Sequence, residues 1–523
     1  MKPIIKIFIV LLTVVTLFTR FYGLETVPPH LGNDEISIAY DAYSVMRTGR
    51  DEHNNFPFLS FQSHNTYKAP LYGYLTAPLT IILPNTATTV RLPSAIAGSL
   101  TVLVLGLLIL TATNNFTLSL SSAVFLALNP WHIFTSRVAL ESNLALFFLT
   151  LGIYLFILAQ KQKQNFALFF LSVVSFALSM YSYHTEWVIT PLIFAFLGTN
   201  FLGPKNKKLW LLSAIFLLLI SPLVIDYLGR LNTSARANTE MLWHEASLKK
   251  VLEQKTPIGR TLLITKTATE NYLDHLSPKT LFFDGLTLLS RDHSFGPGLF
   301  LSVTLPFFLL GWTKLKIFGK YKNFFIFFAL LSPLMASITQ GGINQNRYLP
   351  AAVSFTIIIA AGFTFVFQKS NLILKASLSA LIFISFTYFW LIYYYHFPIY
   401  SAEGFQYGYR QMAQYIQPIK ANYNQIIVEP RFSDFNRYIG VPHLYLSYFN
   451  TEDPRDLLAR HDEVDGMHFG KYRIQEVNWN LEKPKPKSLY LMPMGNLPPE
   501  GLLEMLVEIR LPDGKPAFRI YRS

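Results

Sequence analysis

The stretch TVRLPSAIAGSLTVLVLGLLILTA, residues 89–112, is an almost continuous apolar run in which Arg91 is the only charged residue. A helix needs about 20 apolar residues to cross the hydrocarbon core of a bilayer. Similar runs recur along the chain, so the pattern predicts a mostly α-helical, polytopic membrane protein with about eleven transmembrane helices. The expected spans are 4–22, 89–112, 117–135, 139–159, 166–182, 186–202, 208–227, 297–314, 322–339, 347–367 and 373–396.

The composition also indicates a membrane protein. Of the 523 residues, 51% are hydrophobic and 14% are charged, whereas soluble domains carry about a quarter charged residues. A net charge of +13 would suit a nucleic-acid partner in a soluble protein. No arginine-rich binding motif occurs, so we expect membrane lipids and no nucleic acid as partners. The chain has no cysteine, which excludes disulfides, a thiolate nucleophile and thiolate metal sites.

The short loops between the expected spans indicate the orientation. The loops expected on the same side of the membrane as the N-terminus carry lysines, namely Lys161, Lys163, Lys205, Lys207, Lys316, Lys320 and Lys369. Positive residues beside short loops mark the cytoplasmic side, so we expect a cytoplasmic N-terminus. No small-residue cleavage site follows residues 4–19, and this segment is therefore expected to be an uncleaved first span.

Two regions follow from this topology. Residues 1–396 form a transmembrane domain with long outer loops at 23–88 and 228–296. Residues 397–523 are expected to form a small soluble α/β domain outside the cytoplasm. Its signals are a helix at 406–419, strands at 425–428 and 489–491, and a hairpin of 507–510 with 518–521 around Asp513-Gly514.

The sequence Gly32-Asn33-Asp34-Glu35 places two adjacent carboxylates outside the first span. We expect a helix that begins at Asp34 and stops at Gly49. Asp34 has two interpretations. It either stabilises the first turn of that helix by about 0.5–2 kcal/mol, or it is a general base at the edge of the membrane. Position alone slightly favours the first, and Glu35 is expected to support its neighbour.

Lys68 and Arg347 are candidate cations for a lipid phosphate. Lys68 lies in Tyr67-Lys68-Ala69-Pro70, where aromatic residues and a proline favour a fixed position. A lone loop lysine is otherwise usually solvated or reaches lipid headgroups. Arg347 begins the tenth expected span. It is either an interfacial arginine or a guanidinium fork that matches phosphate geometry.

Further polar residues lie on the same side of the membrane. Arg137 and Glu141 are four residues apart, so an intrahelical ion pair is the simple interpretation. The functional alternative makes Glu141 a second acid that faces the first carboxylate across a cleft. His132 is either an interfacial histidine or a metal ligand together with Glu141. Aromatic residues at a membrane interface would explain the tyrosines and tryptophan nearby, but not His184 and Glu186. These two residues therefore predict a polar pocket between two spans.

Taken in order, these stretches resemble the GT-C membrane glycosyltransferases, in particular the protein O-mannosyltransferases and the bacterial aminoarabinose transferase of lipid A. They cover most of residues 20–350. The matching stretches are Arg20-Phe21-Tyr22-Gly23-Leu24, Gly32-Asn33-Asp34-Glu35, Tyr67-Lys68-Ala69-Pro70-Leu71, Arg91-Leu92-Pro93-Ser94, Asn129-Pro130-Trp131-His132, Ser136-Arg137, Tyr183-His184 and Arg347-Tyr348-Leu349-Pro350.

The resemblance implies inverting transfer of a sugar from a polyprenyl phosphate. The family's acid in the first outer loop acts as base or orients the acceptor, and it corresponds to Asp34. The family's loop lysine and late arginine hold the lipid phosphate and correspond to Lys68 and Arg347. Glu141 stands where the family often has Asp, and with His132 it is the candidate ligand of a divalent metal. The further substrate-binding candidates are Arg137, His184 and Tyr67.

We therefore expect a glycosyltransferase that acts at the extracytoplasmic face on an acceptor glycan, lipid or protein. The alternative is a polytopic lipid or glycan transporter. A transporter would carry paired charges at the membrane midplane and show repeated halves with broken helices. Here the charged residues gather on one side and on long loops, which favours the enzyme. A membrane-anchored binding module at 397–523 would leave the outer-loop polar residues unexplained.

Overall fold

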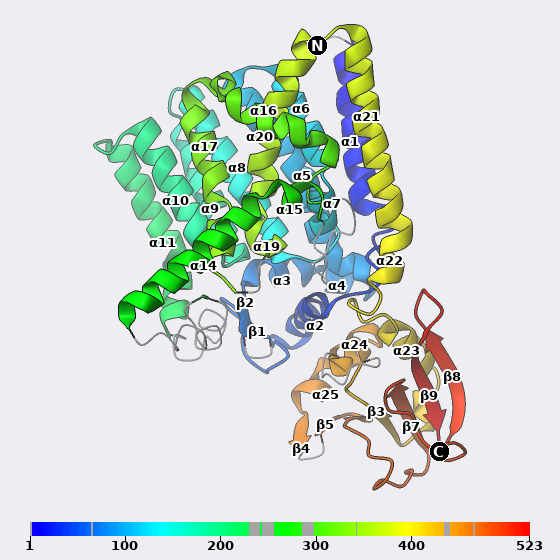
Figure 1. Cartoon of the computed structure of the whole chain (residues 1–523). Helices are drawn as coiled ribbons and strands as arrows, with labels where there is room; N and C mark the ends of the chain where they lie inside the picture. Colours follow the sequence, from blue (N-terminus) through cyan, green and yellow to red (C-terminus); the bar gives the residue numbers. More distant parts are fainter. Residues whose placement is uncertain are drawn as a thin grey trace.

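The computed structural model describes residues 3–63, 66–229, 241–242, 256–284, 298–340, 343–432, 440–463 and 466–523. It consists of a body of helices with a sheet-containing domain at one end (Figure 1). The N-terminus lies at the opposite end of the helical body from this domain. Mostly helical structure with a C-terminal α/β domain is the architecture that the sequence predicts.

The helical body and its outer segments contain the following elements: α1 (Pro3–Phe21), α2 (Asn33–Thr48), β1 (Phe61–Ser63), β2 (Thr66–Lys68), α3 (Pro70–Thr76), α4 (Leu79–Ile82), α5 (Ala87–Thr113), α6 (Phe116–Ala127), α7 (Pro130–Ser136), α8 (Glu141–Lys161), α9 (Phe166–Ser182), α10 (Glu186–Leu197), η1 (Gly198–Leu202), α11 (Lys207–Gly229), α14 (Pro257–Leu276), α15 (Pro278–Phe282), η2 (Ser302–Thr304), α16 (Leu305–Thr313), η3 (Leu315–Tyr321), α17 (Lys322–Leu331), α18 (Leu334–Ser337), α19 (Gln345–Tyr348), α20 (Pro350–Lys369), α21 (Leu372–Leu391), η4 (Ile392–His396) and α22 (Phe397–Tyr400). In the expected outer loop 228–296, residues 230–240, 243–255 and 285–296 lie outside the described residues.

The number of membrane spans differs from the expectation. Each of the eleven expected segments contains a helix. Within the described residues, however, only 5 helices are long and apolar enough to cross a membrane, so a count of eleven is not confirmed. They are Ala87–Thr113, Glu141–Lys161, Lys207–Gly229, Pro350–Lys369 and Leu372–Tyr400. These spans make the chain a multi-pass membrane protein.

Proline explains why some expected spans are divided. The segment 117–135 is split into α6 and α7, because Asn129 caps α7 and Pro130 occupies its first turn. Proline lacks the N–H that would continue the preceding helix, so a new helix starts there. Pro350 begins α20 in the same way.

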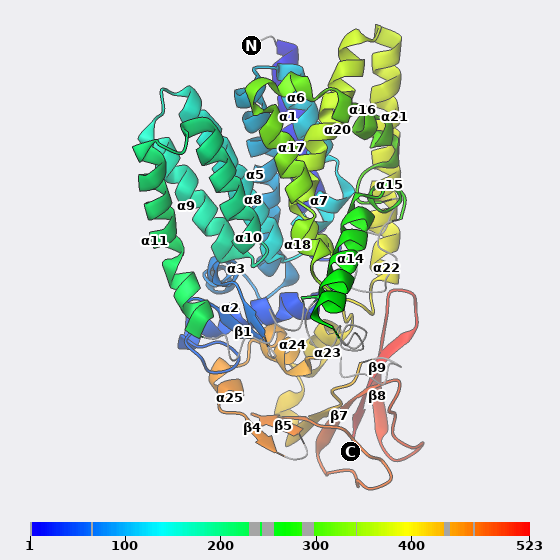
Figure 2. The ribbon, with the colours of Figure 1, turned by 60° about the vertical axis from the view of Figure 1, so that its left-hand side comes forward.

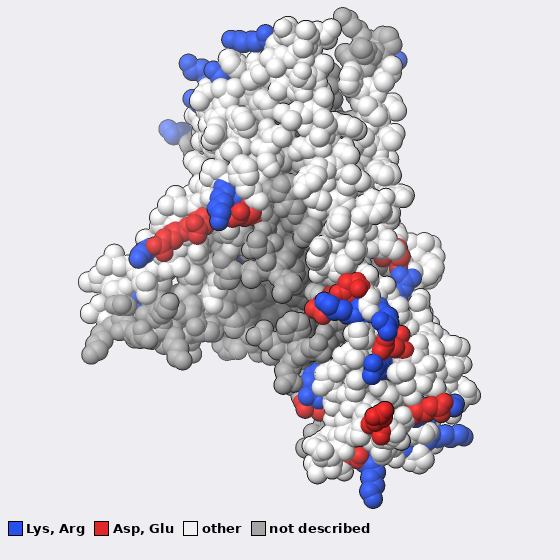
Figure 3. Space-filling view, turned by 45° about the vertical axis from the view of Figure 1, so that its right-hand side comes forward, with Lys and Arg blue, Asp and Glu red and all other residues white. Residues whose placement is uncertain are grey.

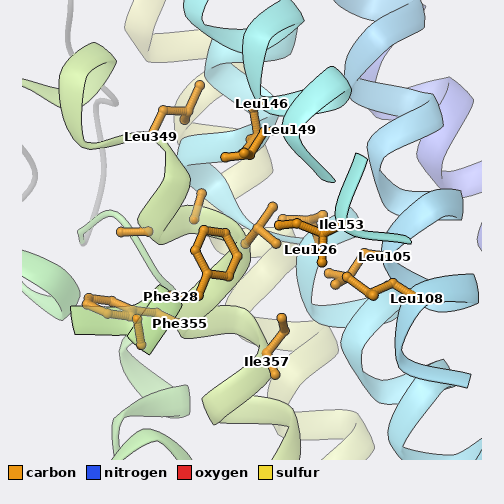
Figure 4. Close-up of a cluster of buried hydrophobic side chains, with 14 of the residues drawn as sticks. Leu105, Leu108, Leu126, Leu146, Leu149, Ile153, Phe328, Leu349, Phe355 and Ile357 are labelled. Atoms are coloured by element: carbon orange, nitrogen blue, oxygen red, sulfur yellow. The ribbon is translucent and has the colours of Figure 1, made fainter. Parts of the chain in front are cut away.

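The helical body is held together by a large apolar core. Leucine, isoleucine and phenylalanine side chains of α5, α6, α8, α17 and α20 meet in it (Figure 4). Helices α16 and α20 pack with little space between their backbones. A Cβ added to Gly362 would lie 2.0 Å from the carbonyl oxygen of Phe307. Small residues allow such close contact between membrane helices.

The C-terminal domain contains a seven-stranded sheet of order β4-β5-β6-β3-β7-β9-β8. Strand β3 pairs in parallel with β6 and β7, and the other neighbours pair antiparallel. The elements of this domain are α23 (Tyr409–Ile416), η5 (Lys420–Asn422), β3 (Gln425–Val428), α24 (Pro442–Phe449), α25 (Pro454–Leu458), β4 (His461–Glu463), β5 (Gly466–Phe469), β6 (Tyr472–Ile474), β7 (Ser488–Pro493), β8 (Glu504–Arg510) and β9 (Pro516–Arg522).

The local predictions for this domain are largely confirmed. Both single strands and the hairpin occur, the hairpin as β8 and β9. The helix expected at 406–419 is shorter and spans Tyr409–Ile416. Gln406 and Gly408 have positive φ values of 53° and 120°, which a right-handed helix cannot contain. Pro418 follows shortly after the helix end.

Helix α2 lies between the helical body and the C-terminal domain, as two views show (Figures 1 and 2). The hydroxyl of Tyr445 donates to the carbonyl of Leu31 at 2.7 Å, and that of Tyr43 donates to the carbonyl of Glu452 at 2.9 Å. The C-terminal domain therefore holds the segment that carries Asp34.

The surface charges separate along the long axis of the molecule. On the face drawn in Figure 3, lysine and arginine gather at the end far from the C-terminal domain. Among the described residues on this face, a broad band without charged side chains follows, and mixed charges lie on α14 and on the C-terminal domain. This is the pattern expected when an apolar belt crosses a bilayer.

Candidate functional site

Helix α2 forms where the sequence predicts it. It spans Asn33–Thr48, and Gly49 ends it with a left-handed φ of 73°. Gly32 occupies the N-cap position, so Asp34 and Glu35 lie in the first turn. Carboxylates in the first turn interact favourably with the partial positive charge of a helix N-terminus.

Glu35 is tightly held inside the protein and is only 2% exposed. Its two oxygens accept from Nε and Nη2 of Arg91 at 2.9 and 3.0 Å. They also accept from the backbone N–H groups of Gly32 and Ala139 at 3.0 and 2.9 Å. Arg91 in turn donates to the carbonyls of Leu24, Pro28 and His30. This geometry fixes the start of α2 against α5 and α8, which suits a supporting role for Glu35.

Lys68 lies beside the first turn of α2. It ends strand β2, whose partner β1 places Phe61 opposite it. The side chain is buried, and its Nζ donates to the carbonyl of Asp34 at 3.3 Å. Pro70 starts α3 two residues later. The strand pair and this proline place the ammonium group beside the first turn of α2.

A cavity of about 280 Å³ brings four of the predicted residues together. Tyr67 and Lys68 line it from the β1–β2 hairpin, His184 lines it from the turn before α10, and Arg347 lines it from α19. The side chain of Asn344 caps α19 by accepting from the backbone N–H of Arg347 at 3.2 Å. Two cations from distant parts of the chain therefore face one cavity.

Asp34 lies beside this cavity, one contact away from its wall. It is partly exposed and is joined to the wall by the hydrogen bond from Lys68 to its backbone carbonyl. The geometry therefore places the first turn of α2 next to the lysine ammonium.

Sequence reasoning missed Asp226 and Ser60, which also line the cavity. Asp226 lies near the C-terminal end of α11, and Ser60 Oγ donates to its Oδ2 at 3.3 Å. The signal was present in the sequence, because an acidic residue inside an apolar span is costly and usually has a function.

Two buried acids beneath Lys68 were also missed. The backbone N–H of Glu52 donates to Asp41 Oδ1 at 3.0 Å. Burial raises the pKa of the Asp41 carboxyl, the charge of Glu52 raises it further, and Lys68 opposes the rise. Burial would also raise the pKa of Glu52, but the imidazole of His53, 3.4 Å away, and the charge of Lys68 help to hold it below its usual value. Glu52, with its lowered pKa, therefore gives the buried ammonium group an opposite charge nearby.

Arg137 lies outside the residues that line the cavity. Its guanidinium donates to the carbonyls of Thr19, Gly23 and Val27 at 2.8–3.1 Å. Helix α7 ends at Ser136 and α8 begins at Glu141. The interpretation of Arg137 and Glu141 as an intrahelical pair is therefore wrong, because a break between two helices separates them.

The candidate metal ligands do not fit a metal site. Nδ1 of His132 lies 2.8 Å from Nη2 of Arg20, so this nitrogen faces a guanidinium. Its neighbourhood is thus already cationic. In the part of the chain that the structure describes, no group of three or more His, Asp or Glu side chains is placed to hold a metal ion. We therefore assign no step to a metal held by His132 and Glu141.

Comparison with known proteins relates this architecture to others. Residues 67–225 match the model of the dolichyl-phosphate-mannose-protein mannosyltransferase family. No curated protein sequence matches the chain. The match begins in β2 and ends inside α11; it includes much of the cavity wall but not Asp226, Tyr227 or Arg347.

Solved structures are similar over longer stretches. ArnT from Cupriavidus metallidurans in the apo state has a TM-score of 0.54 at 10% identity, and the similarity covers 98% of this chain and 97% of ArnT. ArnT bound to undecaprenyl phosphate gives a TM-score of 0.54 at 11% identity, with the same coverage of 98% and 97%. The Archaeoglobus fulgidus oligosaccharyltransferase AglB, in complex with an inhibitory peptide and a dolichol-phosphate, gives 0.50 at 14% identity and covers 86% of this chain and 64% of AglB.

The similarity to ArnT spans nearly the whole length of both chains and includes the C-terminal domain as well as the helical body. Because the identities are low, it concerns the fold. It agrees with the resemblance found in the sequence motifs. The chain has the GT-C glycosyltransferase fold.

Proposed function

We propose that this protein transfers a sugar from a polyprenyl-phosphate carrier to an acceptor hydroxyl at the extracytoplasmic face of a membrane. The observation that carries this proposal is the shared cavity of Lys68 and Arg347. In this scheme residues 1–396 are the catalytic membrane domain and residues 397–523 an extracytoplasmic domain. The basic inner loops support this orientation. ArnT bound to undecaprenyl phosphate supports a lipid-linked donor.

The two cations suit the departing phosphate. As the bond from the sugar C1 to the phosphate oxygen breaks, negative charge grows on that oxygen. The Lys68 ammonium supplies a compact charge, and the Arg347 guanidinium offers a planar pair of donors. Fixed cations in a site with little water stabilise such charge strongly.

Asp34 is the proposed general base. Its carboxylate accepts the proton of the acceptor hydroxyl while the hydroxyl oxygen attacks C1 from the face opposite the phosphate. The new bond joins the acceptor oxygen to C1, and the bond from C1 to phosphate breaks. The products are the glycosylated acceptor and the polyprenyl phosphate, with the configuration at C1 inverted.

The first test is the variant Asp34→Asn, assayed with a panel of polyprenyl-phosphate sugars. Loss of a general base lowers kcat by about 10²- to 10⁴-fold, whereas donor binding should stay close to wild type. Asp456→Asn is the matched control, because Asp456 is an exposed acid in the first turn of α25. Wild-type turnover of Asp34→Asn with every accepted donor would rule out the assigned base.

The second test concerns the phosphate. Arg347→Gln should weaken binding of sugar-free polyprenyl phosphate by about ten- to a hundredfold, because a charge-assisted contact contributes about 1.5–3 kcal/mol. Arg455→Gln is the control, since Arg455 is exposed and pairs with Asp453 on the C-terminal domain. Equal affinity of the wild type and Arg347→Gln would contradict the phosphate assignment.

A further inference from the structure

The cavity has one acidic side chain among the described residues that line it, and this acid has no part in the proposed chemistry. Asp226 shares the cavity with Lys68 and Arg347. A carboxylate repels a phosphate at short range. Its presence is therefore unexplained if the cavity holds only the phosphate and its lipid.

The structure builds Asp226 into the wall from two sides. Helix α11 carries it near its C-terminal end, and Ser60, which precedes β1, donates to its Oδ2. The hairpin that positions Lys68 follows directly after Ser60. The same outer segment therefore positions both the cation and the acid of the cavity.

An aromatic wall, formed by His184, Trp187 and Tyr227, lines the same cavity. The rings of Trp187 and Tyr227 meet edge to face with centroids 5.2 Å apart. The rings of His184 and Trp187 lie 5.1 Å apart at 48°. Trp187 Nε1 donates to the carbonyl of Met180 at 2.9 Å, which fixes the indole.

This combination matches a sugar ring. A pyranose or furanose carries hydroxyl donors at its edge and C–H groups on its faces. Ionised carboxylates accept hydrogen bonds from hydroxyls, and aromatic side chains offer rigid apolar surface at little entropic cost. Ligand pockets typically combine such apolar walls with a few placed polar groups.

We propose that Asp226 and the aromatic wall form the donor-sugar subsite, in which Asp226 accepts hydrogen bonds from sugar hydroxyls and so selects the donor sugar. This inference rests on the proposed function. Lys68 and Arg347 hold the phosphate of the donor, and Asp226 holds the group that is transferred.

The test compares two ligands that differ only in the sugar: undecaprenyl phosphate and undecaprenyl phosphate bearing a hexose that the wild type accepts. Asp226→Asn should bind the sugar-bearing lipid about ten- to a hundredfold more weakly, as expected for loss of a hydrogen bond to a charged group. Its affinity for the sugar-free lipid should not fall, because the substitution also removes the repulsion between the carboxylate and the phosphate, and this binding also shows that the variant is folded. Asp274→Asn, an exposed acid on α14, is the matched control.

A second measurement uses deoxy donors. A site built to bind a hydroxyl rejects an analogue that lacks it. The wild type should therefore discriminate between the full donor and at least one deoxy donor in kcat/KM, and Asp226→Asn should lose that discrimination.

Two results would overturn the inference. Equal weakening for both lipids would mean that Asp226 shapes the cavity as a whole, and unchanged binding of both would mean that it touches neither. Failure of the proposed function looks different. In that case the wild type itself would bind neither lipid, or Arg347→Gln would bind the sugar-free lipid as well as the wild type does.

Discussion

Replacing Glu35 with glutamine should lower the stability of the folded protein. Replacing its neighbour Asp34 with asparagine should chiefly remove activity. Glu35 accepts four hydrogen bonds through two oxygens, two of them from Arg91. Glutamine offers one acceptor oxygen and turns an NH₂ group toward these donors. The substitution therefore leaves the buried guanidinium without its anion.

The magnitude follows from the burial of the pair. Arg91 and Glu35 are 0% and 2% exposed at their side chains. Removing one partner of a buried ion pair costs about 3–5 kcal/mol. Arg91 keeps its three carbonyl acceptors, so we expect the lower end, about 3 kcal/mol. If all 523 residues unfold together, an unfolding entropy of about 2.1 cal/mol/K per residue converts this into a fall in Tm of about 3 °C.

The assay is thermal unfolding in detergent micelles, followed by tryptophan fluorescence. Glu35→Gln, Arg91→Met and the double variant form a cycle. The double variant should lose less stability than the two single losses combined, because both single substitutions break the same pair. Glu500→Gln is the control, since Glu500 is exposed, and its Tm should stay at the wild-type value.

The refuting result is clear for this pair. If Glu35→Gln keeps the wild-type Tm and yet loses kcat as Asp34→Asn does, Glu35 takes part in the reaction and is not a structural partner of Arg91. Strictly additive losses in the cycle would likewise show that the two side chains do not stabilise each other.

Two further predictions concern stability. Burial lowers the pKa of His30 from 6.5 to about 3, so its folded form stays neutral while the unfolded chain takes up a proton below pH 6.5. The stability contributed by the neutral imidazole is complete above pH 6.5 and is lost as the pH falls toward 3. By pH 5 the loss is about 2 kcal/mol. The wild-type Tm should therefore fall between pH 7 and 5. Gly362→Ala should destabilise the protein by about 1–3 kcal/mol, measured by thermal unfolding, because the new Cβ would lie 2.0 Å from the Phe307 oxygen.

Each of these has a matched control. In the His30→Asn variant, Tm should fall less between pH 7 and 5 than in the wild type. His396 is exposed, so the His396→Asn variant should show the wild-type fall. A wild-type Tm that does not fall between pH 7 and 5 would contradict the first prediction. Gly229→Ala should be neutral, since no described residue beyond its own helix turn lies within 4 Å of its Cβ position. Equal stability of the Gly362 and Gly229 variants would contradict the second.

Local features were predictable because local physics determines them. The apolar runs predict helices, since a buried or lipid-facing backbone must satisfy its own hydrogen bonds. Helix α2 and strand β3 occur where capping, glycine and β-branched signals place them. The number of spans was harder to predict, because proline and polar residues divide several apolar runs into short helices.

Some residues of the candidate site could likewise be predicted from the sequence, and others could not. Lys68 and Arg347 stood out in the sequence as candidate cations for a lipid phosphate, and the structure places both on one cavity. Asp226 could have been singled out as an acid in an apolar span, but its place on the cavity, and the burial of Asp41 and Glu52 near Lys68, depend on neighbours that are distant in the chain. Ser60 and Asp226, for example, are 166 positions apart.

The amino-acid sequence alone is enough to establish a helical membrane protein with a C-terminal α/β domain, because hydrophobic length and periodicity are local properties of the chain. The sequence predicts a supporting role for Glu35 beside Asp34, but the contacts that distinguish the two residues form only when the helices pack. Arg91 of α5 and the backbone of Ala139 before α8 bind Glu35, while Lys68 binds the backbone of Asp34 and turns toward the cavity. Contacts of this kind depend on three-dimensional packing, which no local pattern encodes.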